Sequence, residues 1–360
     1  MRQTSRFLLA LLLSGLLSAC DTVAYYGQAA SGQLSILWQR QDIENLLADP
    51  ELPDERRESL ELVLEARDFA RTHMGMEVDG SFRSYVELDR QHALWNVFAA
   101  PQLSLEPLTW CYPLAGCVSY RGYFSEARAR RYAARLADRG YDVYVGGVDA
   151  YSTLGWFNDP LLSTVVERPP HRLFSLVLHE LAHQQLYLPG DTTFNESFAT
   201  FIEQEGLRQW LVGQKESELF LRYQAEERQR AEFVGLVTAY RERFARLYDS
   251  GGSEAELLAG KTALQAELRQ AHADLVEQWG VPAYQGWFDG PLNNAQLGTV
   301  ASYNEMVPAF AALWARQAGD WTAFYDAVRE LAGLPADERR MALEQLAGEP
   351  GRRFTRHVTH

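Results

Sequence analysis

The sequence lacks several features that would assign it to a particular class of protein. It has no surplus of positive charge, because 34 Lys and Arg stand against 48 Asp and Glu, a formal net charge of −14. Such a chain repels phosphate backbones, so we expect no nucleic-acid partner. It shows no internal repeat, and its apolar run at residues 7–17 is too short to span a bilayer comfortably. The 360 residues, with ordinary apolar and charged fractions, indicate a globular protein with a large core.

The first twenty residues have the organisation of an export signal. Arg2 and Arg6 give a positive start, the apolar run follows, and residues 17–20, Leu-Ser-Ala-Cys, resemble a bacterial lipobox. We therefore expect a signal peptide at 1–19 and a lipid on Cys20, which would anchor a periplasm-facing lipoprotein in the bacterial cell envelope. An ordinary signal peptide cut nearby is the alternative. Asp21 resembles the signal that retains enterobacterial lipoproteins in the inner membrane.

Cysteine is scarce, and the chain contains three in all. Besides Cys20 these are Cys111 and Cys117, and two thiols are too few to form a metal site by themselves. An exported chain meets an oxidising compartment, so we expect Cys111 and Cys117 to form a disulfide that closes a small loop.

One apolar segment carries a short polar patch, His-Glu-Leu-Ala-His at residues 179–183. Residues four apart on a helix share one face, so His179 and His183 can point at the same ion. Two neutral imidazoles suit zinc, and Glu180 can reach a water beside the ion and take its proton. This H-E-x-x-H pattern predicts a metallopeptidase site with one Zn²⁺ and Glu180 as the catalytic base. A surface helix that happens to carry two histidines is the alternative.

The following segment offers a third ligand. Residues 188–191, Leu-Pro-Gly-Asp, end the first helix, and Thr192 or Thr193 can cap a second helix. A short connection makes the two helices antiparallel neighbours, so residues equidistant from the turn face each other. The midpoint between His183 and Glu196 falls in this turn, which predicts Glu196 as the third ligand.

Other ligand sets are weaker. Glu203 and Asp191 are fallback ligands, and Glu196 could instead be a first-turn acid that favours the helix dipole. A metzincin site would need Gly at 186 and His at 189, where this chain has Leu186 and Pro189.

His-Glu-Leu-Ala-His followed by Asn-Glu-Ser-Phe-Ala at 195–199 is similar to the gluzincin pattern, whose third ligand is a Glu on a downstream helix. The chain after the signal resembles a bacterial family of lipoproteins described as aminopeptidases. The segments that carry this resemblance are 120–124, 150–160, 179–184, 191–199 and 293–295. The resemblance implies a zinc peptidase that acts on a peptide or protein substrate.

Gluzincins also suggest where substrate and oxyanion are held. In them an edge strand runs along the cleft before the His-Glu pair, so we expect an extended peptide to bind the backbone here. The residues of this stretch are Tyr151, Ser152, Thr153, Leu154 and Gly155. A sheet edge packed against C-terminal helices is the alternative.

A Tyr or His from a C-terminal segment often stabilises the oxyanion in gluzincins. Tyr303 is the expected donor here, and Asn293 and Asn294 are the next candidates. The alternative is that all three are ordinary core or loop residues. We interpret His272 as a solvated surface residue.

Hydrophobic periodicity predicts an α+β fold that is predominantly helical, with a small mixed sheet and a long antiparallel helical hairpin. The resemblance implies that the two helices of the His-Glu motif are zincin-like catalytic helices beside this sheet. The expected helices are 33–47, 53–73, 126–139, 216–248 with its return at 257–275, and 302–317; the expected strands are 141–145 and 147–154. We expect a catalytic region at 20–212, the hairpin at 213–280, and a C-terminal helical region at 281–360 that closes the cleft.

Three functions fit these patterns. The first is a membrane-anchored zinc aminopeptidase, which needs an acid to hold the free amine; Glu203, Asp159 and Asp149 are the candidates. The second is a zinc endopeptidase. The third is a non-catalytic, zincin-like lipoprotein that binds other proteins, although a binding module has no need for Glu180.

Overall fold

The computed structural model describes residues 23–348, apart from 79, 113–115, 154–156 and 215–216, and leaves out the side chains of 217 and 301–304. The expected signal peptide, Cys20, Leu154 and Gly155 therefore lie outside the described residues, as does the side chain of Tyr303.

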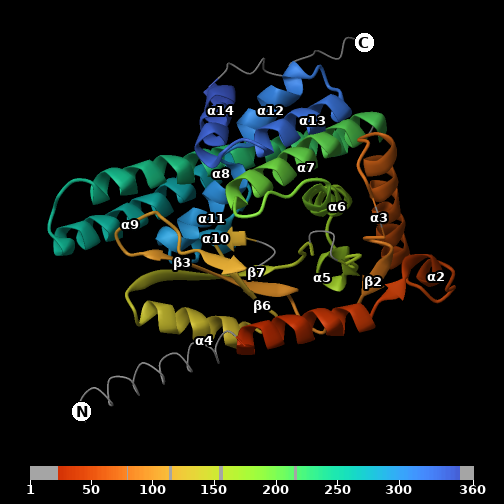
Figure 1. Ribbon diagram of the computed structural model, residues 1–360, viewed down its shortest axis with the longest axis horizontal. Coiled ribbons are helices and arrows are strands. Elements are labelled where there is room, and N and C mark those ends of the chain that lie inside the picture. Colours follow the sequence, from red (N-terminus) through yellow and green to blue (C-terminus); the bar gives the residue numbers. More distant parts are fainter. Residues whose placement is uncertain (1–22, 79, 113–115, 154–156, 215–216, 349–360) are drawn as a thin grey trace.

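The fold is α+β and predominantly helical, as the sequence predicts (Figure 1). The helices are the N-terminal helix at 23–38, α2 (Ile43–Leu47), α3 (Asp54–Thr72), α4 (Glu126–Ala137), α5 (Ser163–Val166), α6 (Pro170–Gln185), α7 (Thr192–Gln214), α8 (Ser217–Tyr248), α9 (Glu254–Trp279), α10 (Gln285–Phe288), α11 (Asn294–Asn304), α12 (Val307–Arg316), α13 (Trp321–Ala332) and α14 (Ala336–Gly348). The strands are β1 (Gln41–Asp42), β2 (Ser84–Val86), β3 (Leu94–Pro101), β4 (Trp110–Tyr112), β5 (Gly116–Val118), β6 (Arg121–Tyr123), β7 (Tyr141–Val148) and β8 (Leu161–Leu162).

The strands form small separate sheets instead of one mixed sheet. The larger is antiparallel, in the order β6-β3-β7, and β3 pairs with β7 along its whole length. The mixed sheet is β1-β2-β8, with two or three residues a strand. The hairpin of β4 and β5 carries the disulfide between Cys111 and Cys117. Helix α4 covers one face of β6-β3-β7, because its alanines and Leu136 pack on Trp95 and Val97.

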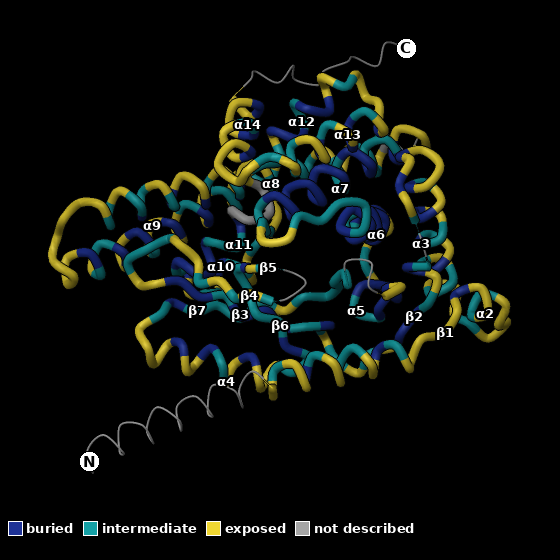
Figure 2. Tube along the Cα trace, in the orientation of Figure 1, coloured by how far each residue is buried: buried dark blue, intermediate teal, exposed yellow. Residues whose placement is uncertain are grey.

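The main core lies among the helices that carry the predicted site. Helices α6 and α7 pack together in its middle, with α3 on one side and α12, α13 and α14 on the other (Figures 1 and 2). Their buried side chains are large and apolar, and Phe174, Phe194, Phe198, Phe310 and Phe324 are completely enclosed. A rigid, dry core of this kind holds α6 and α7 in fixed relative positions.

Helices α8 and α9 form the expected antiparallel hairpin. Ser253 and Glu256 cap the start of α9 with reciprocal hydrogen bonds, which begins the return cleanly after the turn. The apolar faces of the hairpin also pack on α10 and α11 around Phe233, Phe244 and Phe288. The hairpin is therefore built into the fold along one side and extends away from it at its turn (Figure 1).

Lys261 on α9 interrupts the apolar pattern of the hairpin for a structural reason. Its ammonium donates to Asp142 Oδ2 at 2.5 Å and to the carbonyl of Gln102 at 2.8 Å, and it is 6% exposed. Asp142 also accepts from the backbone N–H of Asn294 at 2.9 Å. This buried pair joins the hairpin to the start of β7.

We expect Lys261→Ala to lower the free energy of unfolding by about 3–5 kcal/mol, because it leaves the Asp142 carboxylate buried without its partner. Urea unfolding measures the change, with the exposed neighbour Thr262→Ala as control. Equal stabilities for the two variants would contradict the assignment.

Several expected boundaries are wrong. The first helix does not run from 33 to 47: one helix occupies 23–38, and α2 begins at Ile43 because Asp42 accepts a hydrogen bond from the Asn45 N–H. The expected helix 302–317 is also two helices. Pro308 lies in the first turn of α12, so α11 ends at Asn304 before it.

Two further expectations are corrected. His272 is 6% exposed, not solvated: its ring stacks on Phe288 with centroids 3.7 Å apart, and its Nε2 bonds the carbonyl of Ala283. Residues 147–148 continue β7, and no strand follows them at 149–153. Within the described residues, no helix has both the length and the apolar composition needed to cross a membrane.

Candidate metal centre and active site

Helix α6 places its two histidines by simple helical geometry. Pro170 begins the helix, and its apolar residues, among them Leu178 and Leu181, turn inward to the core. His179 and His183 then lie one turn apart on the same side, with ring centroids 5.0 Å apart. Spacing of four residues on a buried helix is what brings these two rings together.

The turn after α6 sets the position of the third residue. Asn195 bonds both the N–H and the carbonyl of Leu188, at 2.7 and 2.8 Å, which fixes the turn against the start of α7. Asp191, not a threonine, caps α7 by accepting from the Phe194 N–H at 3.0 Å. Glu196, in the first turns of α7, consequently faces the histidines of α6.

Glu196 lies between the two imidazoles. Its Oε2 is 3.5 Å from His179 Nε2 and 3.7 Å from His183 Nε2, and one ligand atom of each residue lies within 4.8 Å of the others. All three residues are buried. This group could hold a metal ion, because two imidazole nitrogens and a carboxylate oxygen converge on one point.

Charge is strongly coupled within this group. Burial raises the pKa of Glu196, but the imidazoles of His183 and His179 outweigh it and hold that pKa at about 2. Burial lowers the pKa of His179, but its hydrogen bonds to Glu196 and Glu203 outweigh it and raise that pKa to about 10. In the metal-free protein a proton therefore stays on His179 at neutral pH, and a cation that replaces it would meet the same carboxylates.

The two fallback ligands have other tasks. Glu203 Oε2 lies 3.1 Å from His179 Nδ1, on the side of the ring opposite to Glu196. A carboxylate there fixes the orientation and tautomer of a metal-binding histidine. Asp191 caps α7 and accepts from Arg339 at 2.9 Å, so it is tied to α14 and not to the metal group.

We expect Glu203→Ala to lower the affinity for a divalent metal by about 10- to 100-fold, because His179 loses the acceptor that orients it. Competition with a chelator measures the change. Glu205→Ala is the matched control, since Glu205 lies on the same helix and binds Arg208 and Gln209. An unchanged affinity in Glu203→Ala would remove Glu203 from the metal centre.

Glu180 faces a cavity beside the metal group. The cavity has a volume of about 410 Å³, and Glu180, His183 and Glu196 line it together. Burial raises the pKa of Glu180, although the two imidazoles oppose the rise. The Tyr and Phe residues that line the cavity are Tyr25, Tyr112, Tyr120, Phe124, Tyr151 and Tyr187.

The stretch expected to bind substrate as a strand edge reaches the cavity in a different form. Tyr151, Ser152 and Thr153 line it, but they belong to no strand. The backbone N–H and the hydroxyl of Thr153 both donate to Asp159, at 2.8 and 2.6 Å. Because the Thr153 N–H already donates to Asp159, this N–H is not available to pair with a bound peptide.

The residues expected around the oxyanion are placed elsewhere. Asn293 donates to the carbonyl of Val143, and Asn294 donates to the carbonyls of Pro101 and Gln102, so both brace the sheet. Neither asparagine lines the cavity of Glu180, and the side chain of Tyr303 lies outside the described residues.

Two tyrosines of the cavity were missed from the sequence. Burial raises the pKa of Tyr120, with Glu196, Tyr187 and Glu180 adding to the rise, and burial and Glu196 raise the pKa of Tyr187. Both hydroxyls therefore remain proton donors close to the carboxylates. Tyr187 follows His183 by four residues, which was the available signal; Tyr120 comes from the loop before β6 and has no such link to the motif.

The acids considered for holding a free amine are all engaged. Asp149 pairs with Arg168 and with His92, each at 2.5 Å. Asp159 is 3% exposed and accepts from Thr153. Glu203 Oε2 lies within hydrogen-bond distance of His179 Nδ1. None of these three carboxylates lines the cavity beside Glu180.

Comparison with known proteins adds one family. A search of curated proteins and a search of solved structures found no match. A family model described as "Putative aminopeptidase" matches residues 24–343, which includes α6, α7 and all the cavity residues named above. The chain therefore belongs to this family of aminopeptidase-like proteins.

Proposed function

We propose that the protein is a zinc-dependent peptidase of gluzincin type, acting as an aminopeptidase. The observation that carries this proposal is a converging group of three possible metal ligands, two of which, His183 and Glu196, line one cavity together with the buried Glu180 and two tyrosines. A protein that only binds partners has no use for Glu180 in that place. Membership of the aminopeptidase-like family agrees with the proposal.

The donor set fits zinc. His179 and His183 offer imidazole nitrogens, and Glu196 offers one carboxylate oxygen, which is the ligand set of a catalytic zinc site with one position left open. The open position would face the cavity, since Glu196, His183 and Glu180 all line it. An ion held there would act as a Lewis acid toward water and toward the substrate carbonyl.

Glu180 would supply the base. It takes a proton from the attacking water as the oxygen bonds to the carbonyl carbon, and returns the proton to the amine nitrogen as the C–N bond breaks. Burial raises its pKa, which brings the carboxylate closer to the range in which it can both accept and return a proton near neutral pH. The other carboxylate among the described residues that line the cavity is Glu196, and it lies against both imidazoles.

Tyr187 and Tyr120 would donate to the oxyanion that forms at the attacked carbonyl. We expect that replacing the donating tyrosine by Phe lowers kcat by about 10²- to 10³-fold with little change in KM. The reason is that its hydrogen bond strengthens only as negative charge develops on the carbonyl oxygen. Steady-state kinetics of Tyr187→Phe and Tyr120→Phe separate the two, with Tyr144→Phe outside the cavity as control. Unchanged kcat in both variants would return the role to Tyr303.

A second part of the proposal concerns which end of the peptide enters the cavity. In an aminopeptidase the faces of Tyr25, Tyr112 or Tyr151 could hold the free ammonium, since tyrosine rings attract cations. Because Asp149, Asp159 and Glu203 are all engaged elsewhere, a zinc endopeptidase is the second candidate.

A peptide-library digest read by mass spectrometry tests the function. Stepwise loss of amino-terminal residues, absent from Glu180→Gln, is the expected result. Internal cuts would replace the aminopeptidase with an endopeptidase. No cleavage by protein loaded with one zinc per chain would favour the non-catalytic binding protein.

We also propose that a lipid on Cys20 holds the protein in the bacterial envelope, facing the periplasm. The proposal is supported by the Leu-Ser-Ala-Cys sequence at 17–20. Labelled palmitate should enter the wild-type chain in bacterial cells and not Cys20→Ser. Equal labelling of the two chains would exclude this anchor.

A further inference from the structure

The N-terminal helix has an uncharged sequence and an outward face whose apolar side chains none of the described residues buries. None of residues 23–38 is charged. Val23, Tyr26, Leu34 and Trp38 are 71%, 44%, 46% and 83% exposed. Their spacings of three, eight and four residues put them on one side of the helix. Scattered exposed apolar residues are ordinary, but a row of four along one helix face is not.

The inner face fixes this helix on the protein. Ile36 is 1% exposed, Gln28 bonds the N–H of Phe124 at 3.0 Å, and a Cβ on Gly32 would fall within 2.3 Å of the Phe124 ring. The helix therefore lies tightly along the edge of the molecule, next to α4, with its outer face toward solvent (Figure 2). Its apolar row is a rigid surface and not a loose end.

A basic flank accompanies the apolar row. Arg128, Arg131 and Arg135 are exposed and follow one side of α4 at helical spacing. With Arg121 they line a groove of about 210 Å³ against Tyr25 and its neighbours at the start of the N-terminal helix. None of the described residues that line this groove is acidic. A concentration of arginine is unexpected in a chain with a net charge of −14.

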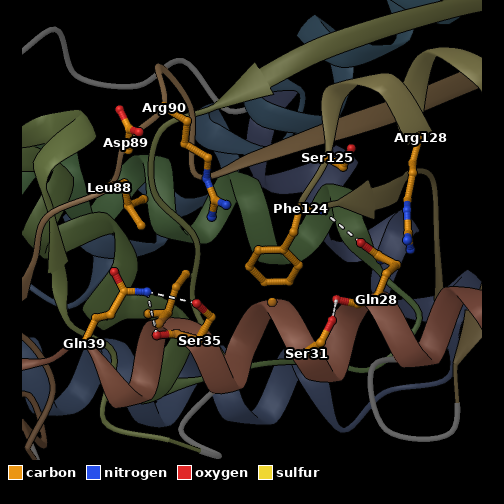
Figure 3. Close-up of a pocket in the computed structure, with 12 residues that line it drawn as sticks. Gln28, Ser31, Ser35, Gln39, Leu88, Asp89, Arg90, Phe124, Ser125 and Arg128 are labelled. Atoms are coloured by element: carbon orange, nitrogen blue, oxygen red, sulfur yellow. Dashed lines mark hydrogen bonds between the residues drawn. The ribbon is translucent and has the colours of Figure 1, made fainter.

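The same flank of the helix, further toward its C-terminus, forms a second pocket of about 520 Å³, and Gln28 and Arg128 line both hollows. Gln28, Ser31 and Ser35 line it from the helix and Gln39 from the turn that follows. Arg128, Asp89 and Arg90 line it from the opposite side, where Arg90 donates to the carbonyls of His92 and Ala93 (Figure 3). Guanidinium groups and hydroxyls donate hydrogen bonds, and the oxygens of phosphate esters accept them. The apolar row is thus bordered on one flank by the exposed arginines of α4, Arg128, Arg131 and Arg135, which can reach anionic headgroups.

We propose that the outer face of the N-terminal helix and the arginines of α4 bind the surface of an anionic phospholipid bilayer. Val23, Tyr26, Leu34 and Trp38 would enter the boundary between headgroups and acyl chains, while the arginines contact lipid phosphates. An uncharged helix face with a terminal tryptophan, beside a basic helix, is the composition that such a boundary favours.

The position of this surface in the chain supports the same occupant. Val23, at one end of the apolar row, follows Cys20, the residue expected to carry lipid, by three positions. The inner face of the same helix contributes Tyr25, Ala29 and Gln33 to the cavity of Glu180. Docking would therefore hold that cavity about one helix diameter, ~10 Å, from the lipid. The proposal does not depend on the peptidase activity.

Vesicle flotation of the chain that starts at Asp21 tests the proposal without any lipid anchor. The chain that starts at Asp21 keeps every described residue of this surface. The protein should float with vesicles of phosphatidylglycerol and phosphatidylethanolamine, and about tenfold less with phosphatidylcholine vesicles. Added salt should weaken the binding, because the arginine contacts are partly screened.

Matched variants locate the surface. Leu34→Ser with Trp38→Ser, and separately Arg128→Ser with Arg131→Ser, should each lower the partition into anionic vesicles by about tenfold. Leu221→Ser with Met341→Ser is the control, because Leu221 and Met341 are 63% and 58% exposed on other helices. All six positions are at the surface, so folding is preserved and circular dichroism checks it.

Three outcomes would overturn the proposal. The protein could fail to float with either kind of vesicle. The control variant could lose as much binding as Leu34→Ser with Trp38→Ser, which would indicate general stickiness. The protein could instead form dimers, seen by light scattering, that Trp38→Ser abolishes while vesicles remain unbound; the row would then be an interface with a second copy of this chain.

Discussion

Glu180→Gln should lower kcat by about 10²- to 10⁴-fold while the protein keeps its metal, because the amide cannot take a proton from water. The substitution preserves the size of the side chain in the buried cavity, so the fold and the ligands His179, His183 and Glu196 should be unaffected. Turnover of a peptide, together with metal content by atomic absorption, measures both parts of the expectation.

Glu167→Gln is the control for this change, since Glu167 is exposed and lies ahead of α6 outside the cavity. It should have wild-type kcat. Wild-type turnover in Glu180→Gln would end the proposed mechanism. Loss of metal together with activity would instead mean that Glu180 holds the site together, and its role as base would remain unsupported.

His183→Ala should abolish stoichiometric metal binding and, with it, peptide hydrolysis. Removal of one of three ligands leaves His179 and Glu196, which are too few to hold zinc against a chelator. Metal content after dialysis measures the loss. His171→Ala is the matched control: His171 lies on the same helix, is buried, and bonds Glu226 at 3.0 Å away from the metal group. It should keep one metal per chain.

Metal binding by this group of residues has an expected pH dependence. The pKa of His179 is raised to about 10 in the metal-free protein, so at pH 7 the ring is protonated and must lose its proton to bind an ion. Metal affinity should consequently rise as pH rises toward 10, and binding at pH 7 should release about one proton. Calorimetry in two buffers with different ionisation enthalpies counts the protons; release of none would contradict the pairing of His179 with Glu196 and Glu203.

Local patterns were sufficient for much of the fold. Helices α3, α4 and α6 were anticipated within a few residues, because their apolar positions repeat at the helical period and their ends carry Pro, Ser or Gly signals. The hairpin of α8 and α9 followed from one continuous rhythm with a Gly-rich turn. The first helix was misplaced because residues 33–47 fit the helical period only loosely, and Asp42 restarts the chain as α2.

The sequence by itself determined the metal group. The spacing of His179 and His183 is a helical property, and Glu196 follows from its distance to a short turn, so each depends on neighbours along the chain. The tertiary structure alone decided what surrounds that group. Tyr120 reaches the cavity from another part of the chain, and the Thr153 N–H donates to Asp159 instead of remaining open to a peptide. Lys261 pairs with Asp142, 119 residues away in the sequence. Contacts between distant segments leave no periodic pattern in a single sequence, because packing and burial select the partners only after the chain has folded.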